Sequence, residues 1–109
     1  MVITMTLEEW IAKKSRDAIR TEINSIAEAL GAGSNETLKR NAMITAKSFL
    51  KTNKLADPIT LARASFYVAL KKTDENAEEK VKLIIDNNGN TNRWWLYIIP
   101  MLEKHFPTG

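Results

Sequence analysis

The sequence predicts an all-α protein, a compact bundle of about five helices packed around one apolar helix at residues 57–72. Three observations lead to this fold class. Apolar residues recur at three- and four-residue steps over most of the chain. The alternation typical of a half-buried strand is confined, at most, to residues 2–5. Residues 57–72 are apolar on two sides, as expected for a helix that is covered on both sides.

The central helix, DPITLARASFYVALKK, has a marked start and end. Asp57 can cap the first free N–H groups, and Pro58 follows at a position where a missing N–H costs nothing. The helix ends at a lysine pair, where cations suit the negative end of the helix dipole. We expect Phe66 to be fully buried. The two apolar stripes consist of Ile59, Ala62, Phe66, Ala69 and Leu70, and of Leu61, Ala64 and Val68.

Two helices are expected before the central one. Thr6 and Glu9 have the spacing of a capping box, so the first helix begins there and runs until Gly31 and Gly33 stop it. Ser34 or Asn35 caps the second, which runs to about residue 52 with Asn53 as a left-handed end. Apolar residues recur along the first helix at three- and four-residue steps and form a stripe that Trp10 and Ala18 flank. The stripe consists of Leu7, Ile11, Ile19, Ile23, Ile26 and Leu30.

Two further helices are expected after the central one. Thr73 or Asp74 caps the fourth, which holds acids in its first turn and breaks at residues 87–89. Thr91 or Asn92 opens the fifth, which is apolar almost throughout. Pro100 lies well inside this last helix, so a kink is expected there.

Composition bounds the class of protein. The chain has 109 residues, which fits one helical domain over residues 1–109. It contains no cysteine, which excludes disulfides and thiolate sites and suits a reducing compartment. No apolar run is long enough to span a membrane, and the start MVITMT is too short for a secretory signal. A cytoplasmic protein is expected.

The charge is unevenly distributed along the chain. The formal net charge is +3, but residues 37–72 hold eight basic residues and one acid, a net charge of +7. On a helical wheel, Arg40, Lys47, Lys51 and Lys54 fall within about 60° of each other, opposite the apolar face of the second helix. Such a stripe can follow a phosphate backbone without reading its sequence. The alternative is an ordinary solvated face. Lys71 and Lys72 extend the patch if their helix end lies nearby.

The last helix carries the second candidate site. Trp94 and Trp95 are adjacent, so they point about 100° apart and cannot face one core equally. Tryptophan is enriched in binding hot spots, which makes these two candidate contacts for a protein partner or for a second copy of the chain. The alternative is that they fill the core.

No motif for catalysis is present. Asp86, Asn88 and Asn90 match three positions of a calcium loop, but the glycine and the closing glutamate do not follow. His105 is the only histidine, and no Gly-rich phosphate loop occurs. We therefore expect a non-enzymatic protein with no cofactor, metal or small-molecule substrate. The leading hypothesis is an accessory subunit that contacts nucleic acid in a larger assembly. The alternative is a protein-interaction module such as an adaptor, an inhibitor or an immunity-type protein.

Overall fold

Helices account for every regular element in the part of the chain that the computed structural model describes, which is residues 6–53, 56–87 and 94–107. No strand occurs in these residues, so the all-α prediction is confirmed. The helices are α1 (Leu7–Ala29), α2 (Glu36–Leu50), α3 (Pro58–Lys71), α4 (Ala77–Asn87), α5 (Trp94–Tyr97) and α6 (Ile99–Glu103).

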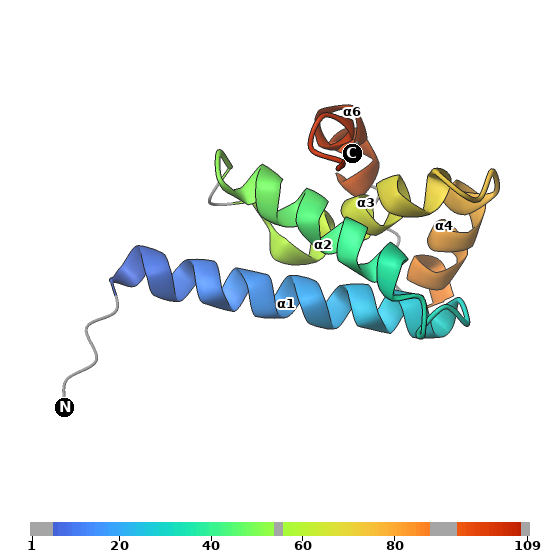
Figure 1. Ribbon diagram of the computed structural model, residues 1–109, viewed down its shortest axis with the longest axis horizontal. Helices are drawn as coiled ribbons and strands as arrows, with labels where there is room; N and C mark the ends of the chain where they lie inside the picture. Colours follow the sequence, from blue (N-terminus) through green and yellow to red (C-terminus); the bar gives the residue numbers. More distant parts are fainter. Residues whose placement is uncertain (1–5, 54–55, 88–93, 108–109) are drawn as a thin grey trace.

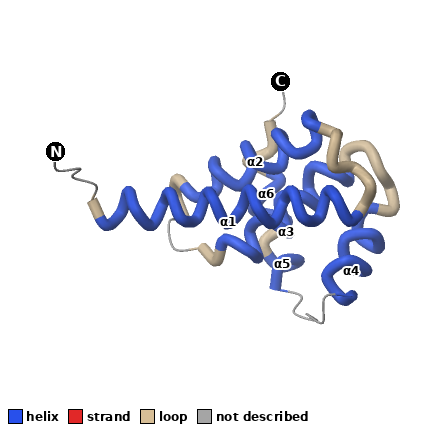
Figure 2. Tube along the Cα trace, turned by 90° about the horizontal axis from the view of Figure 1, so that it is seen from below, coloured by secondary structure: helices blue, strands red, loops and turns tan. Residues whose placement is uncertain are grey.

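Helix α3 is the centre of the bundle. It contacts each of the other five described helices, and Figures 1 and 2 show it enclosed between α1, α2, α4 and α6. Phe66 is 0% exposed, as predicted. Eight of the 14 residues of α3 are buried, on both of its apolar stripes. The central-helix prediction is therefore confirmed.

Side-chain caps set the starts of the first three helices. The Thr6 hydroxyl oxygen accepts the N–H of residue 9 at 3.1 Å. The side-chain oxygens of Asn35 and Asp57 accept the N–H groups three residues on, at 3.1 and 3.0 Å. Each cap satisfies a backbone donor that has no partner inside its helix. The sequence predicted the caps at Thr6 and Asp57, and Asn35 is one of the two residues it offered for the second helix.

The ends of α1 and α2 are built differently. After α1, Gly31 adopts φ +75°, and the N–H groups of Gly31 and Ala32 bond back to the carbonyls of Glu28 and Ala27. This is the Schellman arrangement that a glycine permits. The left-handed end predicted at Asn53 is wrong, since no described residue other than glycine has positive φ. The Asn53 amide instead donates to a carbonyl in the last turn of α2, at 3.2 Å.

The fourth helix begins later than predicted. Its first residue is Ala77, whereas the sequence suggested a cap at Thr73 or Asp74. Two interactions of Asp74 explain the delay. Its N–H bonds to the carbonyl of Leu70, and its carboxylate accepts the N–H of Asn76 at 2.9 Å. The chain therefore makes a further turn before α4 starts.

The single last helix predicted with a kink is two helices, α5 and α6. They are separated at Ile98, and Pro100 lies in the first turn of α6. Proline has no N–H to donate to the carbonyl four residues earlier, and it fits well in a first turn. The helix therefore breaks at Ile98, and Pro100 falls in the first turn of the next helix. The predicted opening of this segment, at residues 91–92, lies outside the described residues.

The first half of α1 projects beyond the rest of the bundle (Figure 1). Only the second half of its predicted stripe is core, where Ile19, Ile23 and Ile26 are buried. Leu7 is 72% exposed, and Trp10, predicted to flank the stripe, is 51% exposed. The stripe is thus buried only in its second half, because no other described helix reaches the start of α1. The projection leaves open space between α1 and the end of α2.

Candidate polyanion-binding face

The outward face of α2 is basic. Arg40, Lys47 and Lys51 are exposed and lie opposite the buried side of the helix. None of these three cations forms an ion pair with any described residue. Their charges are therefore available to a ligand. Lys54, the fourth member of the predicted stripe, lies outside the described residues.

Helix α1 adds two arginines to the same side of the molecule. Two grooves lie along the junction of α1 and α2, and Lys47 lines both of them. Arg20 lines the smaller groove, of about 370 Å³, together with Arg40. Arg16 lines the larger one, of about 1420 Å³, together with Lys51. We call Arg16, Arg20, Arg40, Lys47 and Lys51 the basic face.

Sequence reasoning missed Arg16 and Arg20. Both belong to residues 1–36, whose net charge is −2, so charge counting along the chain pointed away from them. A wheel drawn for one helix also cannot show which face of a second helix lies beside it. Only the packing of α1 against α2 brings the two arginines to the stripe.

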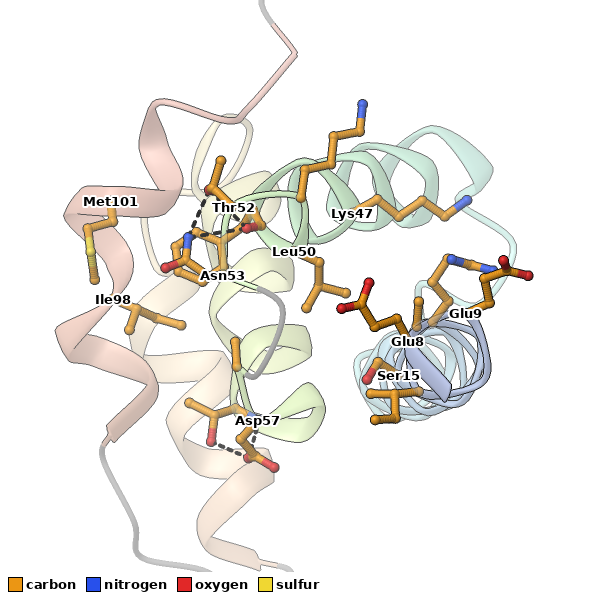
Figure 3. A pocket seen from close by; sticks show the side chains of 17 residues that line it. Glu8, Glu9, Ser15, Lys47, Leu50, Thr52, Asn53, Asp57, Ile98 and Met101 are labelled. Atoms are coloured by element: carbon orange, nitrogen blue, oxygen red, sulfur yellow. Dashed lines mark hydrogen bonds between the residues drawn. The ribbon is translucent and has the colours of Figure 1, made fainter. Parts of the chain in front are cut away.

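Acids compete with the basic face at one end. Glu8 and Glu9 line the larger groove, and Figure 3 shows Lys47 reaching from α2 towards the side of α1 that carries Glu9. Asp57 also lines this groove, but its carboxylate is engaged by the N–H and hydroxyl of Thr60. The smaller groove has one acid, Glu36, which pairs with a lysine of α2. The positive charge is therefore less opposed at the smaller groove.

The floor of the larger groove is apolar. Figure 3 shows Leu50 pointing into it from α2, while Ile98 and Met101 lie on its far side. The walls come from α1, from the end of α2, from the start of α3 and from Ile98 and α6. This groove opens beside the part of α1 that extends beyond the other described helices (Figure 1).

Lys71 and Lys72 serve a different purpose from the one predicted. Both pair with Glu103 of α6, Lys72 at 3.4 Å. The Lys71 ammonium lies over the Tyr67 ring and that of Lys72 over Phe106, at 5.8 and 5.0 Å from the ring centroids. Because α2 and α3 run in opposite directions, the last turn of α3 lies at the other end of the bundle from the last turn of α2 (Figure 1). The structure does not join these lysines to the α2 stripe.

The pair of lysines stabilises the charged form of Glu103. The hydrogen bond from Lys71 lowers the pKa of this carboxyl, Lys72 adds to the effect, and partial burial opposes it. The three residues thus hold the end of α6 against α3.

The prediction of Trp95 as a partner contact is corrected by its burial. The side chain is 1% exposed and meets the Tyr67 ring edge-on at 5.7 Å between centroids. A partner cannot reach it without rearrangement of the core. The side chain of Trp94 lies outside the described residues. Among the described side chains of α5 and α6, the large apolar ones that are exposed are Tyr97 and Met101.

A serine and a histidine meet between α2 and the C-terminal segment. The Ser48 hydroxyl and Nδ1 of His105 are 2.8 Å apart, and the His105 ring lies edge-on to Phe49. No carboxylate among the described residues bonds to the other nitrogen of this ring. The contact therefore fastens the chain after α6 to α2.

The described residues contain no group of three or more metal-binding side chains. None of the described helices is both long enough and apolar enough to cross a membrane. Comparison of the chain with protein-family models, with curated proteins and with solved structures found no match. The function must therefore be argued from the chemistry of the surface.

Proposed function

We propose that this protein is a non-enzymatic accessory protein that binds nucleic acid through the basic face, with little sequence preference. The observation that supports this is the set of three exposed cations on α2, which form no ion pair with any described residue and lie beside two arginines of α1. A face that is merely solvated usually mixes charges of both signs. Action in the cytoplasm, in a larger nucleoprotein assembly, is part of this proposal.

The dimensions of the face suit a short stretch of backbone. Arg40 and Lys51 are eleven residues apart on one helix, which is about 17 Å at the standard rise. A stacked strand rises about 3.4 Å per nucleotide, so the face spans about five phosphates. No aromatic residue belongs to the basic face, so contacts are expected to phosphates rather than to stacked bases.

Removal of the α2 cations tests the proposal. The triple variant Arg40→Gln, Lys47→Gln, Lys51→Gln should lose retention on heparin and on immobilised single-stranded DNA at low salt. The matched control replaces Lys80, Lys82 and Lys104 by glutamine, which changes the net charge equally at positions that line neither groove. The control should be retained like the wild type. Equal retention of both variants would contradict the proposal.

A protein-interaction module is the second candidate function. The observation that favours it is the exposed apolar surface of Leu7 and Trp10 on the projecting half of α1, with Tyr97 and Met101 on α5 and α6. Exposed apolar residues mark an interaction surface where they form a contiguous patch. A pull-down with and without nuclease separates the two candidates, because only binding through nucleic acid is lost on digestion. Light scattering shows whether the partner is a second copy.

A further inference from the structure

The smaller groove between α1 and α2 is lined by cations from both helices. Arg20 stands on the α1 side, and Lys39, Arg40 and Lys47 stand on the α2 side. The groove has a volume of about 370 Å³, and apolar side chains lie between the cations. These apolar lining residues are Ile23, Met43 and Ile44. Four positive charges share this space with one carboxylate.

The cations differ in how firmly they are held. Lys39 is 19% exposed and donates to the carbonyl of Gly33 at 2.7 Å and to Glu36 at 3.1 Å, so it is fixed in place. Arg20 is 3.5 Å from Asp17, and both side chains of this pair are more than half exposed. Exposed pairs of this kind contribute little. Arg20 is thus free to turn to another anion.

We propose that this groove is a phosphate subsite in which Arg20 and Arg40 bind one phosphate group from opposite sides, with Lys47 at its edge. The inference rests on the proposed function, under which the phosphate belongs to the bound strand. A guanidinium can donate two parallel hydrogen bonds to one phosphate. The volume lies near the lower end of the range of about 300–1,000 Å³ for ligand pockets, so the groove admits a phosphate or pyrophosphate group.

The charge balance of the groove supports an anionic occupant. Like charges gathered in one groove repel one another, and an anion between them relieves the repulsion. The neighbouring apolar surface reduces access of water on one side, which strengthens each charged contact. The subsite also explains why the strand would be bound by two helices rather than by α2 alone.

Titration with inorganic pyrophosphate, followed by amide chemical shifts, tests the subsite without nucleic acid. The wild type should show saturable shifts at Ile23, Met43 and Ile44. Arg20→Gln should weaken binding about tenfold or more, as expected for loss of hydrogen bonds to a charged group. Lys14→Gln is the matched control, since it removes one positive charge from the same helix at an exposed position that lines neither groove, and it should bind pyrophosphate like the wild type. Both positions are exposed, and unchanged thermal midpoints would show that both variants fold.

The outcomes separate the subsite from the proposed function. Chemical-shift changes away from this groove, no binding by the wild type, or equal weakening by Arg20→Gln and Lys14→Gln would overturn the subsite. A single-stranded oligonucleotide is titrated into the same three proteins. If the wild type binds it while the pyrophosphate result is negative, the proposed function stands and the subsite falls. If the wild type binds pyrophosphate at the groove but no oligonucleotide, the proposed function falls and the subsite serves a free phosphorylated ligand.

Discussion

Replacement of Phe66 by alanine should destabilise the protein more than most single substitutions. Phe66 is fully buried in α3, and α3 contacts every other described helix, so the neighbours cannot close the space from one side alone. A phenylalanine-to-alanine change in a core costs about 3–5 kcal/mol. Domains of this size unfold with about 5–15 kcal/mol, so a large part of the free energy of unfolding is lost.

Urea unfolding followed by circular dichroism measures this loss. If the free energy of unfolding falls by about 1.5 kcal/mol per molar urea, the urea midpoint of Phe66→Ala should lie about 2–3 M below that of the wild type. The matched control is Leu83→Ala on α4, where the leucine is 62% exposed. The control should stay within about 0.5 kcal/mol of the wild type. A loss below about 1 kcal/mol for Phe66→Ala would refute the enclosed position of α3.

Three further substitutions test individual contacts. The Ser65 hydroxyl is buried and has no hydrogen-bond partner among the described residues, so Ser65→Ala should raise the free energy of unfolding by about 1 kcal/mol. A clear loss of stability would show that the hydroxyl is paired. The hydrogen bond from Lys71 lowers the pKa of Glu103, so this carboxylate stabilises the fold above its ordinary pKa and the effect fades as the pH falls through the lowered value. In urea unfolding at neutral pH, the wild type should be more stable than Glu103→Gln by at most about 1 kcal/mol, because the ion pair is partly exposed. This difference in the free energy of unfolding should shrink below about pH 4.3. A difference that stays constant down to about pH 2 would contradict the prediction. Glu9→Gln removes an acid beside the basic face and should tighten oligonucleotide binding by about two- to fivefold in fluorescence anisotropy. An equal gain for Glu79→Gln on α4 would show that only net charge matters.

Local rules were sufficient to predict the helices that are set by side-chain caps and apolar stripes. Thr6, Asn35 and Asp57 cap helices in the structure because each places an oxygen near an N–H three residues on. The enclosure of α3 followed from its lack of a polar face. These features depend on neighbours along the chain, so they can be read from one sequence.

Features that depend on packing could not be predicted. The stripe of α1 continues to Leu7, but only the structure shows that α1 is longer than the helices beside it. In the same way, α5 and α6 are separated at Ile98 and both contact α3, and the presence of Pro100 allows this break but does not require it.

The sequence predicted the part of the candidate site that lies on α2 but not the part that lies on α1. The stripe of Arg40, Lys47 and Lys51 followed from the period of α2, and the structure leaves these three cations unpaired within the described residues. Arg16 and Arg20 join them only through the contact of α1 with α2. The distant lysine pair of α3 was expected to extend the stripe but is bound by α6 instead.

The salt dependence of oligonucleotide binding tests the central claim most directly. For single strands, the slope of log K against log salt is about −0.7 per neutralised phosphate, so three cations contribute about −2. Binding is measured by fluorescence anisotropy between about 50 and 200 mM salt. The wild type should show a slope of about −2 or steeper. The variant Arg40→Gln, Lys47→Gln, Lys51→Gln should be shallower by about 2, while the control at Lys80, Lys82 and Lys104 should keep the wild-type slope. A wild-type slope near zero, or the same slope for both triple variants, would contradict binding through the basic face.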